Sequence, residues 1–146
     1  MSLNPRVPLS HAVGIATDLM NRIKNDCSLT YAVDFRICGS VRRNAPDCGD
    51  IDVAITREAF DINEMALRGL LDSYEDTAKG RLSDGYLHDM KVEFYVGPAA
   101  GFGAMQLFST GSPSFNVRCR LIAKRNGWAQ NQYGLWVGDT KSGVMV

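Results

Sequence analysis

The fold is decided by the stretch Cys38-Gly39-Ser40-Val41-Arg42-Arg43 and, after a short loop, Cys48-Gly49-Asp50-Ile51-Asp52-Val53-Ala54-Ile55-Thr56. The second half predicts a strand, because apolar and polar residues alternate along it. Successive side chains of a strand point to opposite faces, so Asp50 and Asp52 share one face. Two adjacent carboxylates repel each other and are costly to desolvate unless a cation lies between them. A hard divalent ion, above all Mg²⁺, fits this pair.

The first half of the stretch supplies groups that suit a phosphate. Gly39 lets the backbone pass close to a ligand, Ser40 offers a hydroxyl and an N–H, and Arg42 and Arg43 offer guanidinium forks. A phosphate binder beside a metal binder predicts a nucleotidyl-transfer site. An Asp-x-Asp pair alone is also typical of solvated residues at a strand end, so the prediction depends on both halves together.

The composition fits one globular domain. The chain has 146 residues, of which 45% are hydrophobic and 22% charged, with a formal net charge of zero, so no global basic field indicates nucleic acid. The four cysteines lack a C-x-x-C spacing, and we expect no zinc. No apolar run is long enough to span a membrane, so we expect a soluble, cytoplasmic protein (in the host cytoplasm if the source is viral).

A local basic cluster stands out against this neutral background: Arg118, Arg120, Lys124 and Arg125. It is either a DNA-binding patch or the solvated face of a helix, and the sequence favours neither.

Periodicity predicts the elements around the central stretch. We expect helices at 9–26 (capped by Ser10), 58–72, 102–108 and 115–126 (capped by Ser114), and strands at 33–38, 51–56, 74–78, 90–96 and 133–137, with 86–88 ambiguous. In the helix at 58–72 the apolar spacing runs through Ile62, Met65, Ala66 and Leu70, which we expect to face the sheet.

Glu93 lies in the middle of the strand predicted at 90–96, on one face with Lys91 and Tyr95. If this strand pairs beside 51–56, Glu93 comes next to Asp50 and Asp52, and three carboxylates can hold two Mg²⁺ ions about 3.5–4 Å apart. The alternative is an exposed edge strand that carries a glutamate without a role. Spacing alone leaves both open.

The chain resembles the family X DNA polymerases, the group of polymerase beta. The motifs follow the family's order: Arg6-Val7-Pro8, the central stretch, Lys91-Val92-Glu93, Thr110-Gly111-Ser112, Phe115-Asn116, Arg120 and Asn131-Gln132-Tyr133-Gly134-Leu135. The resemblance implies an α+β fold, with a nucleotidyltransferase palm (a mixed sheet with flanking helices) in residues 1–97. Residues 98–146 would form a small, thumb-like segment, and we expect a minimal member of the family that lacks the lyase domain.

The resemblance also implies roles for individual residues. Asp50, Asp52 and Glu93 would bind two Mg²⁺ ions, for which Mn²⁺ can substitute. The nucleotide would be bound by Arg6, Gly39, Ser40, Arg43, Gly49, Phe108, Ser109, Gly111 and Asn116, and DNA by Arg118, Arg120, Lys124 and Arg125. Two positions depart from the family: Glu93 stands where an aspartate is usual, and Ser109 follows Phe108 where a second aromatic is usual.

These features predict a DNA-directed DNA polymerase in which a primer 3′-hydroxyl attacks the α-phosphorus of a dNTP and releases pyrophosphate, in DNA repair or gap filling. Its partners would be a dNTP and a primer–template or gapped DNA, and its oligomeric state is left open. Two alternatives remain: a nucleotidyltransferase acting on a hydroxyl outside DNA, and a non-catalytic nucleotide- or DNA-binding module with a decayed site.

Overall fold

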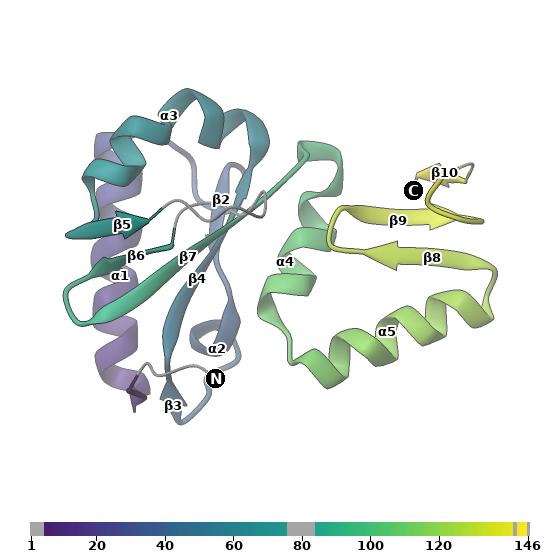
Figure 1. Ribbon diagram of the computed structural model, residues 1–146, viewed down its shortest axis with the longest axis horizontal. Helices are drawn as coiled ribbons and strands as arrows, with labels where there is room; N and C mark the ends of the chain where they lie inside the picture. Colours follow the sequence, from purple (N-terminus) through teal and green to yellow (C-terminus); the bar gives the residue numbers. More distant parts are fainter. Residues whose placement is uncertain (1–4, 76–83, 142, 146) are drawn as a thin grey trace.

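The computed structural model describes residues 5–75, 84–141 and 143–145, which form two parts lying side by side (Figure 1). The first part contains β1 (Val7–Pro8), α1 (Leu9–Asp26), β2 (Phe35–Ile37), α2 (Gly39–Arg42), β3 (Asp47–Cys48), β4 (Asp50–Thr56), α3 (Arg57–Gly69), β5 (Ser73–Glu75), β6 (Asp84–Leu87) and β7 (Met90–Gly97). The second contains a 3₁₀ turn (Ala99–Gly101), α4 (Phe102–Thr110), α5 (Pro113–Arg125), β8 (Trp128–Asn131), β9 (Gly134–Val137) and β10 (Val144–Met145).

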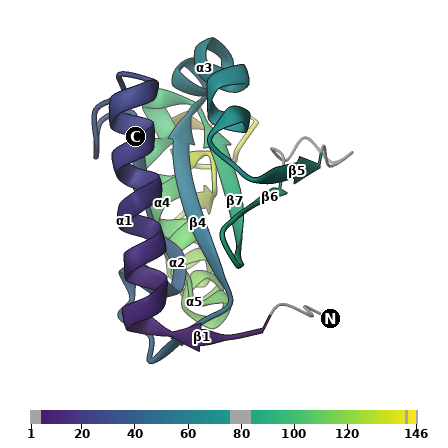
Figure 2. The same ribbon diagram turned by 90° about the vertical axis from the view of Figure 1, so that its left-hand side faces the viewer.

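Among the described residues, five strands form one mixed sheet in the order β2-β4-β7-β6-β5. β4 and β7 are parallel, and the other pairs are antiparallel. α1 and α3 pack on the face that carries Val53 and Ile55 and form the main core with it. α4 covers the opposite face, where Ala54 packs with Phe102 and Met105. The centre of the sheet is therefore buried on both sides. α1 and α4 lie on either side of β4 in Figure 1, and in the turned view of Figure 2 α1 lies in front of the sheet and α4 behind it.

The register of β4 and β7 decides the position of Glu93. In this parallel pair Asp50 lies opposite Lys91, and Asp52 lies opposite Glu93. β6 pairs with the other side of β7, so β7 is an interior strand. The predicted neighbourhood of Glu93 and the two aspartates is confirmed, and the edge-strand alternative is wrong.

Both predicted serine caps are wrong. α1 begins at Leu9, whose N–H donates to the Pro46 carbonyl at 3.1 Å, so loop backbone takes the place of a capping side chain at Ser10. The cap of α5 is Ser112, whose Oγ accepts from the N–H of Phe115 at 3.4 Å. Pro113 occupies the first helical position, where its fixed φ and missing N–H fit, so the helix starts before Ser114.

The predicted buried face of α3 is wrong at Ile62, Met65 and Ala66, which are exposed, and right at Leu70, which is buried. Ile62 and Met65 are 75% and 82% exposed, whereas Ala59, Phe60 and Leu67 are buried. The Phe60 ring packs against Phe94 of β7, with centroids 6.4 Å apart. Burial of this large ring sets the rotation of the helix and turns the smaller Ile–Met stripe to solvent.

The strand predictions need three changes. The strand expected at 33–38 shortens to β2, since Val33 is 64% exposed. β5 covers the start of the strand expected at 74–78, of which 76–78 lie outside the described residues. The ambiguous segment at 86–88 belongs largely to β6. The α+β class itself is confirmed.

In the second part, β8, β9 and β10 form an antiparallel sheet, although only the strand at β9 was predicted. α4 packs against β4 and β7 as well as against β8 and β9. Because this helix belongs to both packing units, the division between residues 97 and 98 stays a prediction. None of the described helices is long and apolar enough to cross a membrane.

Candidate active site

Three carboxylates converge where β4 and β7 run side by side. Asp50 and Asp52 project from one face of β4 and Glu93 from β7, and one oxygen of each lies within 4.8 Å of the others. All three residues are half-buried. Oxygen ligands at this spacing suit a hard divalent cation such as Mg²⁺.

The electrostatics of this cluster also favour a cation. The pKa of Asp52 is raised to about 8, mainly because burial penalises its charged form and further because Asp50 and Glu93 lie close. Burial, and then Glu93, raise the pKa of Asp50 as well. Oδ1 of Asp52 is buried and has no hydrogen-bond partner within the described part of the chain. A bound divalent ion would satisfy this oxygen and neutralise the repulsion, so the residues present fit a metal.

Glu93 is held from both sides by its neighbours on the same face of β7. Lys91 Nζ lies 3.0 Å from Oε1, and the Tyr95 hydroxyl donates to Oε2. Burial and the nearby Asp52 raise the pKa of Tyr95, so it remains a hydrogen-bond donor. Sequence analysis placed these three residues on one face but assigned Tyr95 no role.

The turn after β2 fits closely around Asp52. Gly39 has a φ of +64°, in the region that favours glycine, and the Cys38 N–H donates to the Asp52 carbonyl at 2.8 Å. Ser40 is buried at the start of α2. Gly39 was expected to make room for a ligand, and in the structure it makes room for the carboxylate of Asp52.

Arg6 lies at the margin of the carboxylate cluster. It forms an ion pair with Asp47, and its Nη2 donates to the Asp47 carbonyl at 2.9 Å. The pKa of Arg6 is raised, first by this hydrogen bond and then by the charge of Asp47. A Cβ at Gly49 would lie 3.4 Å from its Nη1, so Arg6 reaches the backbone just before Asp50.

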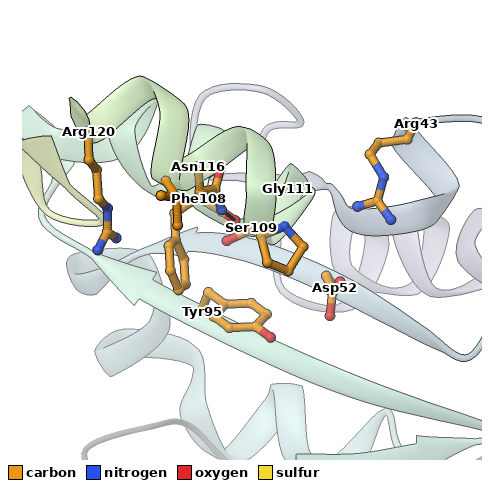
Figure 3. A pocket seen from close by; sticks show the side chains of 10 residues that line it. Arg43, Asp52, Tyr95, Phe108, Ser109, Gly111, Asn116 and Arg120 are labelled. Carbon is orange, nitrogen blue, oxygen red and sulfur yellow. Dashed lines mark hydrogen bonds between the residues drawn. The ribbon is translucent and has the colours of Figure 1, made fainter. Parts of the chain in front are cut away.

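An open pocket of about 420 Å³ extends from Asp52 along α4 and α5 (Figure 3). Arg43 and Arg120 lie at opposite ends, with Tyr95 and Phe108 between them. The remaining lining residues are Asp52, Ser109, Gly111, Pro113, Asn116 and Val117. The pocket thus brings together most of the residues predicted to bind the nucleotide, and adds Tyr95, Pro113 and Val117.

Aromatic and polar contacts organise this pocket. The Phe108 ring meets Tyr95 edge to face at 6.1 Å, and the Arg120 guanidinium lies 5.8 Å from the Phe108 centroid. Arg43 donates to the Thr110 carbonyl. Ser109 Oγ and Asn116 Oδ1 are buried without a hydrogen-bond partner among the described residues, and both residues line the pocket. The Ser109 hydroxyl can donate a hydrogen bond to a ligand or accept one, whereas Oδ1 of Asn116 can only accept.

Only one residue of the predicted basic cluster lines the pocket. Arg120 faces the pocket, while Arg118, Lys124 and Arg125 are exposed on α5 and do not line it.

Comparison with known proteins shows which family the chain belongs to. Residues 6–102 match the family model described as DNA polymerase beta palm, and residues 105–146 match the one described as DNA polymerase beta thumb. The chain belongs to the polymerase beta family. The sequence prediction of a family X polymerase is thereby confirmed.

Two relatives in this family are similar across much of the chain. DNA polymerase lambda of Rattus norvegicus is 29% identical over 121 residues, which are 67% of this chain and 21% of the relative. The DNA polymerase/3'-5' exonuclease PolX of Bacillus subtilis (strain 168) is 26% identical over 141 residues, which are 92% of this chain and 24% of the relative. The chain therefore spans less than a quarter of either relative.

A solved structure supports the polymerase beta fold. The crystal structure of Leishmania infantum polymerase beta, a ternary P/T complex, superposes with a TM-score of 0.70 at 23% identity. The match covers 95% of this chain and 60% of that one, so it includes both palm and thumb.

Proposed function

We propose that this chain is a DNA-directed DNA polymerase that adds a deoxynucleotide to a primer 3′-hydroxyl and releases pyrophosphate. The proposal is supported above all by the carboxylate cluster of Asp50, Asp52 and Glu93, whose Asp52 lines a pocket shared by the residues that match the polymerase beta palm and thumb. Its partners would be a dNTP and a primer–template or gapped DNA, and gap filling in DNA repair is the role that fits this family.

The carboxylates would hold the reacting groups through divalent ions. Two Mg²⁺ ions, or Mn²⁺ in their place, would supply charge stabilisation for the attacking and leaving oxygens. Asp50 and Asp52 would bind both ions, and Glu93 the one nearer the primer hydroxyl. Lys91 and Tyr95 would keep Glu93 in place, since both of its oxygens already have a partner on β7.

The arginines would bind the triphosphate. Arg43 now donates to a backbone carbonyl and Arg6 to Asp47, and both side chains are exposed enough to exchange these partners for phosphate oxygens. Ser40, Gly39 and Gly49 would line the backbone approach to the phosphates. Guanidinium forks match phosphate oxygens in geometry and charge.

The thumb side of the pocket would bind the sugar, the base and the template. Phe108, Ser109 and Gly111 would lie along the sugar, with Asn116 beside the base and Arg120 toward the template strand. The exposed Arg118, Lys124 and Arg125 would contact the DNA backbone. Because Ser109 is small, Phe108 would make most of the contact with the sugar. The selectivity for dNTP over rNTP is therefore the property to measure.

Primer extension tests the proposal directly. Labelled templated primer, gapped duplex and bare single strand are each incubated with dNTPs and Mg²⁺ or Mn²⁺, and a folded Asp52→Ala variant serves as the control. We expect templated incorporation that the variant lacks. A parallel reaction offers an RNA end in place of DNA. Incorporation there alone would favour the other nucleotidyltransferase, and nucleotide binding without any transfer would favour the decayed module.

A further inference from the structure

A second pocket, of about 310 Å³, lies apart from the active site. It is lined by Tyr31, Arg36, Ile37, Val41 and Arg42, none of which lines the catalytic pocket. Arg42 and Arg43 are consecutive, yet they contact different turns of α4. Arg43 donates to the carbonyl of Thr110, whereas Arg42 donates to the side chain of Gln106. The proposed polymerase chemistry uses Arg43 and leaves Arg42 without a role.

The two guanidinium groups that line this pocket converge on one neutral oxygen at its edge, outside the lining residues. Arg36 Nη1 lies 3.2 Å and Arg42 Nη1 3.5 Å from Oε1 of Gln106. Within residues 5–75, 84–141 and 143–145, neither arginine forms an ion pair with a carboxylate. Like charges that share a neutral acceptor repel each other, and an anion between them would relieve the repulsion.

Arg36 is oriented before any ligand arrives. Its guanidinium lies 5.8 Å from the centroid of the Tyr31 ring, a cation–π contact. Tyr31 is itself fixed, because its ring packs edge to face on Phe35 at 5.2 Å and its hydroxyl accepts from the Ile37 N–H at 3.3 Å. Orientation of a binding group in advance lowers the entropic cost of binding.

We propose that Arg36 and Arg42 form a second phosphate-binding site, separate from the triphosphate site of the polymerase. Two guanidinium forks without a carboxylate partner exclude a metal ion, and their doubled positive charge suits a phosphate group, which carries up to two negative charges and several acceptor oxygens. The phosphate belongs either to a strand of bound DNA or to a free polyphosphate. Only the first source rests on the proposed polymerase function.

Gln106→Glu is the informative variant, because it places a carboxylate of almost the same shape between the two arginines. If they merely hold α4, the new ion pairs preserve or raise the melting temperature and leave DNA binding unchanged. If they bind phosphate, the carboxylate occupies the site. Each phosphate contact contributes about 0.9 to the slope of log K against log salt, so the slope falls by about 1 and affinity by roughly fivefold or more at low salt.

The binding assay uses fluorescence anisotropy of a labelled primer–template, without dNTP or divalent metal, so its result does not depend on turnover. Arg36→Gln/Arg42→Gln should reproduce the smaller slope. Arg57→Gln is the matched control, since Arg57 is an exposed arginine paired with Asp61 on α3, and it should keep the wild-type slope.

The wild-type protein supplies an independent measurement if a variant fails to fold. NMR of the arginine Nε–Hε groups follows titration with tripolyphosphate and, separately, with primer–template DNA. Shifts of Arg36 and Arg42 with DNA, together with the reduced slope, support a strand phosphate. Shifts with tripolyphosphate alone support a free polyphosphate. Unshifted Arg36 and Arg42 signals in both titrations, with a wild-type slope for Gln106→Glu, would overturn the site.

Discussion

The carboxylate of Asp52 fills the space that a side chain at position 39 would need, so only glycine fits there. An ideal Cβ built on Gly39 would lie 2.1 Å from Oδ2 of Asp52. The positive φ of Gly39 is a second constraint, since side chains strain the backbone there. The turn that delivers Ser40 and the carboxylate proposed to bind metal are thus fitted to each other within the palm.

Gly39→Ala should therefore displace Asp52. We expect a loss of about 1–3 kcal/mol in stability from backbone strain and a fall in incorporation on the order of 100-fold, the effect of about 1 Å of misplacement. Thermal melting and single-turnover primer extension check both. Gly14→Ala is the control, because a Cβ there meets no atom within 4 Å in the middle of α1. It should raise stability by about 0.5–1 kcal/mol. Equal activity of the two variants would contradict the fit.

The raised pKa of Asp52 predicts how stability without metal depends on pH. An ordinary aspartate has a pKa of 3.8, and folding raises the pKa of Asp52 to about 8. Between these values the folded state binds more protons than the unfolded one, so its stability falls as pH rises from about 4 to 8. One pKa unit corresponds to about 1.4 kcal/mol. Because solvent partly screens this half-buried carboxylate, we expect a smaller loss than the full shift implies, of about 2 kcal/mol or more.

Chemical denaturation in EDTA at pH 5 and pH 8 measures this loss. Asp52→Asn should be less sensitive to pH and more stable than the wild type at pH 8, while failing to incorporate nucleotide. Mg²⁺ should restore the stability of the wild type at pH 8 and have little effect on the variant. An equal decline with pH for both proteins would place the titrating group elsewhere.

The sequence could predict the carboxylate cluster because the pattern of each strand determines its face. Alternation put Asp50 and Asp52 on one face and Glu93 on a face with Lys91 and Tyr95, and only the pairing of the two strands was missing. The buried aliphatic residues on the other faces fix that register, since a shift by one residue would turn them outward.

Other features depend on contacts that no local pattern contains. The rotation of α3 follows from the packing of Phe60 on Phe94, which lie 34 residues apart in the sequence. Phe60 is on the helix that follows β4, and Phe94 is on β7, the strand parallel to β4. β8 has little apolar alternation, and it forms because β9 supplies its hydrogen-bond partners. The bond from Tyr95 to Glu93 requires a particular side-chain rotamer, which residue spacing does not specify.

Tyr95→Phe should loosen Glu93 without disturbing the packing around it. The substitution removes the hydroxyl that donates to Glu93 and keeps the ring that packs on Phe108. A hydrogen bond to a charged group contributes about 1.5–3 kcal/mol, so we expect Mn²⁺ affinity and kcat each to fall on the order of tenfold, with little change in KM for dNTP. Paramagnetic resonance measures bound Mn²⁺ directly. Tyr74→Phe, at an exposed tyrosine on β5, is the control. Unchanged Mn²⁺ affinity in Tyr95→Phe would mean that the hydroxyl does not position Glu93.

Glu93→Asp tests whether the site is built for the longer carboxylate. With glutamate, the three ligand oxygens already lie within 4.8 Å of one another, and both oxygens of Glu93 have partners on β7. Removal of one methylene would draw the carboxylate back from the metal position and away from Tyr95. We therefore expect Glu93→Asp to incorporate nucleotide at least about tenfold more slowly with Mg²⁺, since this ion demands near-ideal geometry, and Glu93→Ala to be slower still.

A comparison of rates with Mg²⁺ and Mn²⁺ distinguishes a metal ligand that is misplaced from one that is missing. It binds oxygen sites of this kind, and proteins accommodate it in less regular geometry than Mg²⁺. Single-turnover rates with each metal should show recovery by Mn²⁺ in Glu93→Asp and little recovery in Glu93→Ala, because only the aspartate variant keeps a carboxylate near the ion. A faster rate for Glu93→Asp with Mg²⁺ would show that the extra methylene is a handicap which β7 has not accommodated. Wild-type rates in both variants would show that Asp50 and Asp52 bind the metals without Glu93.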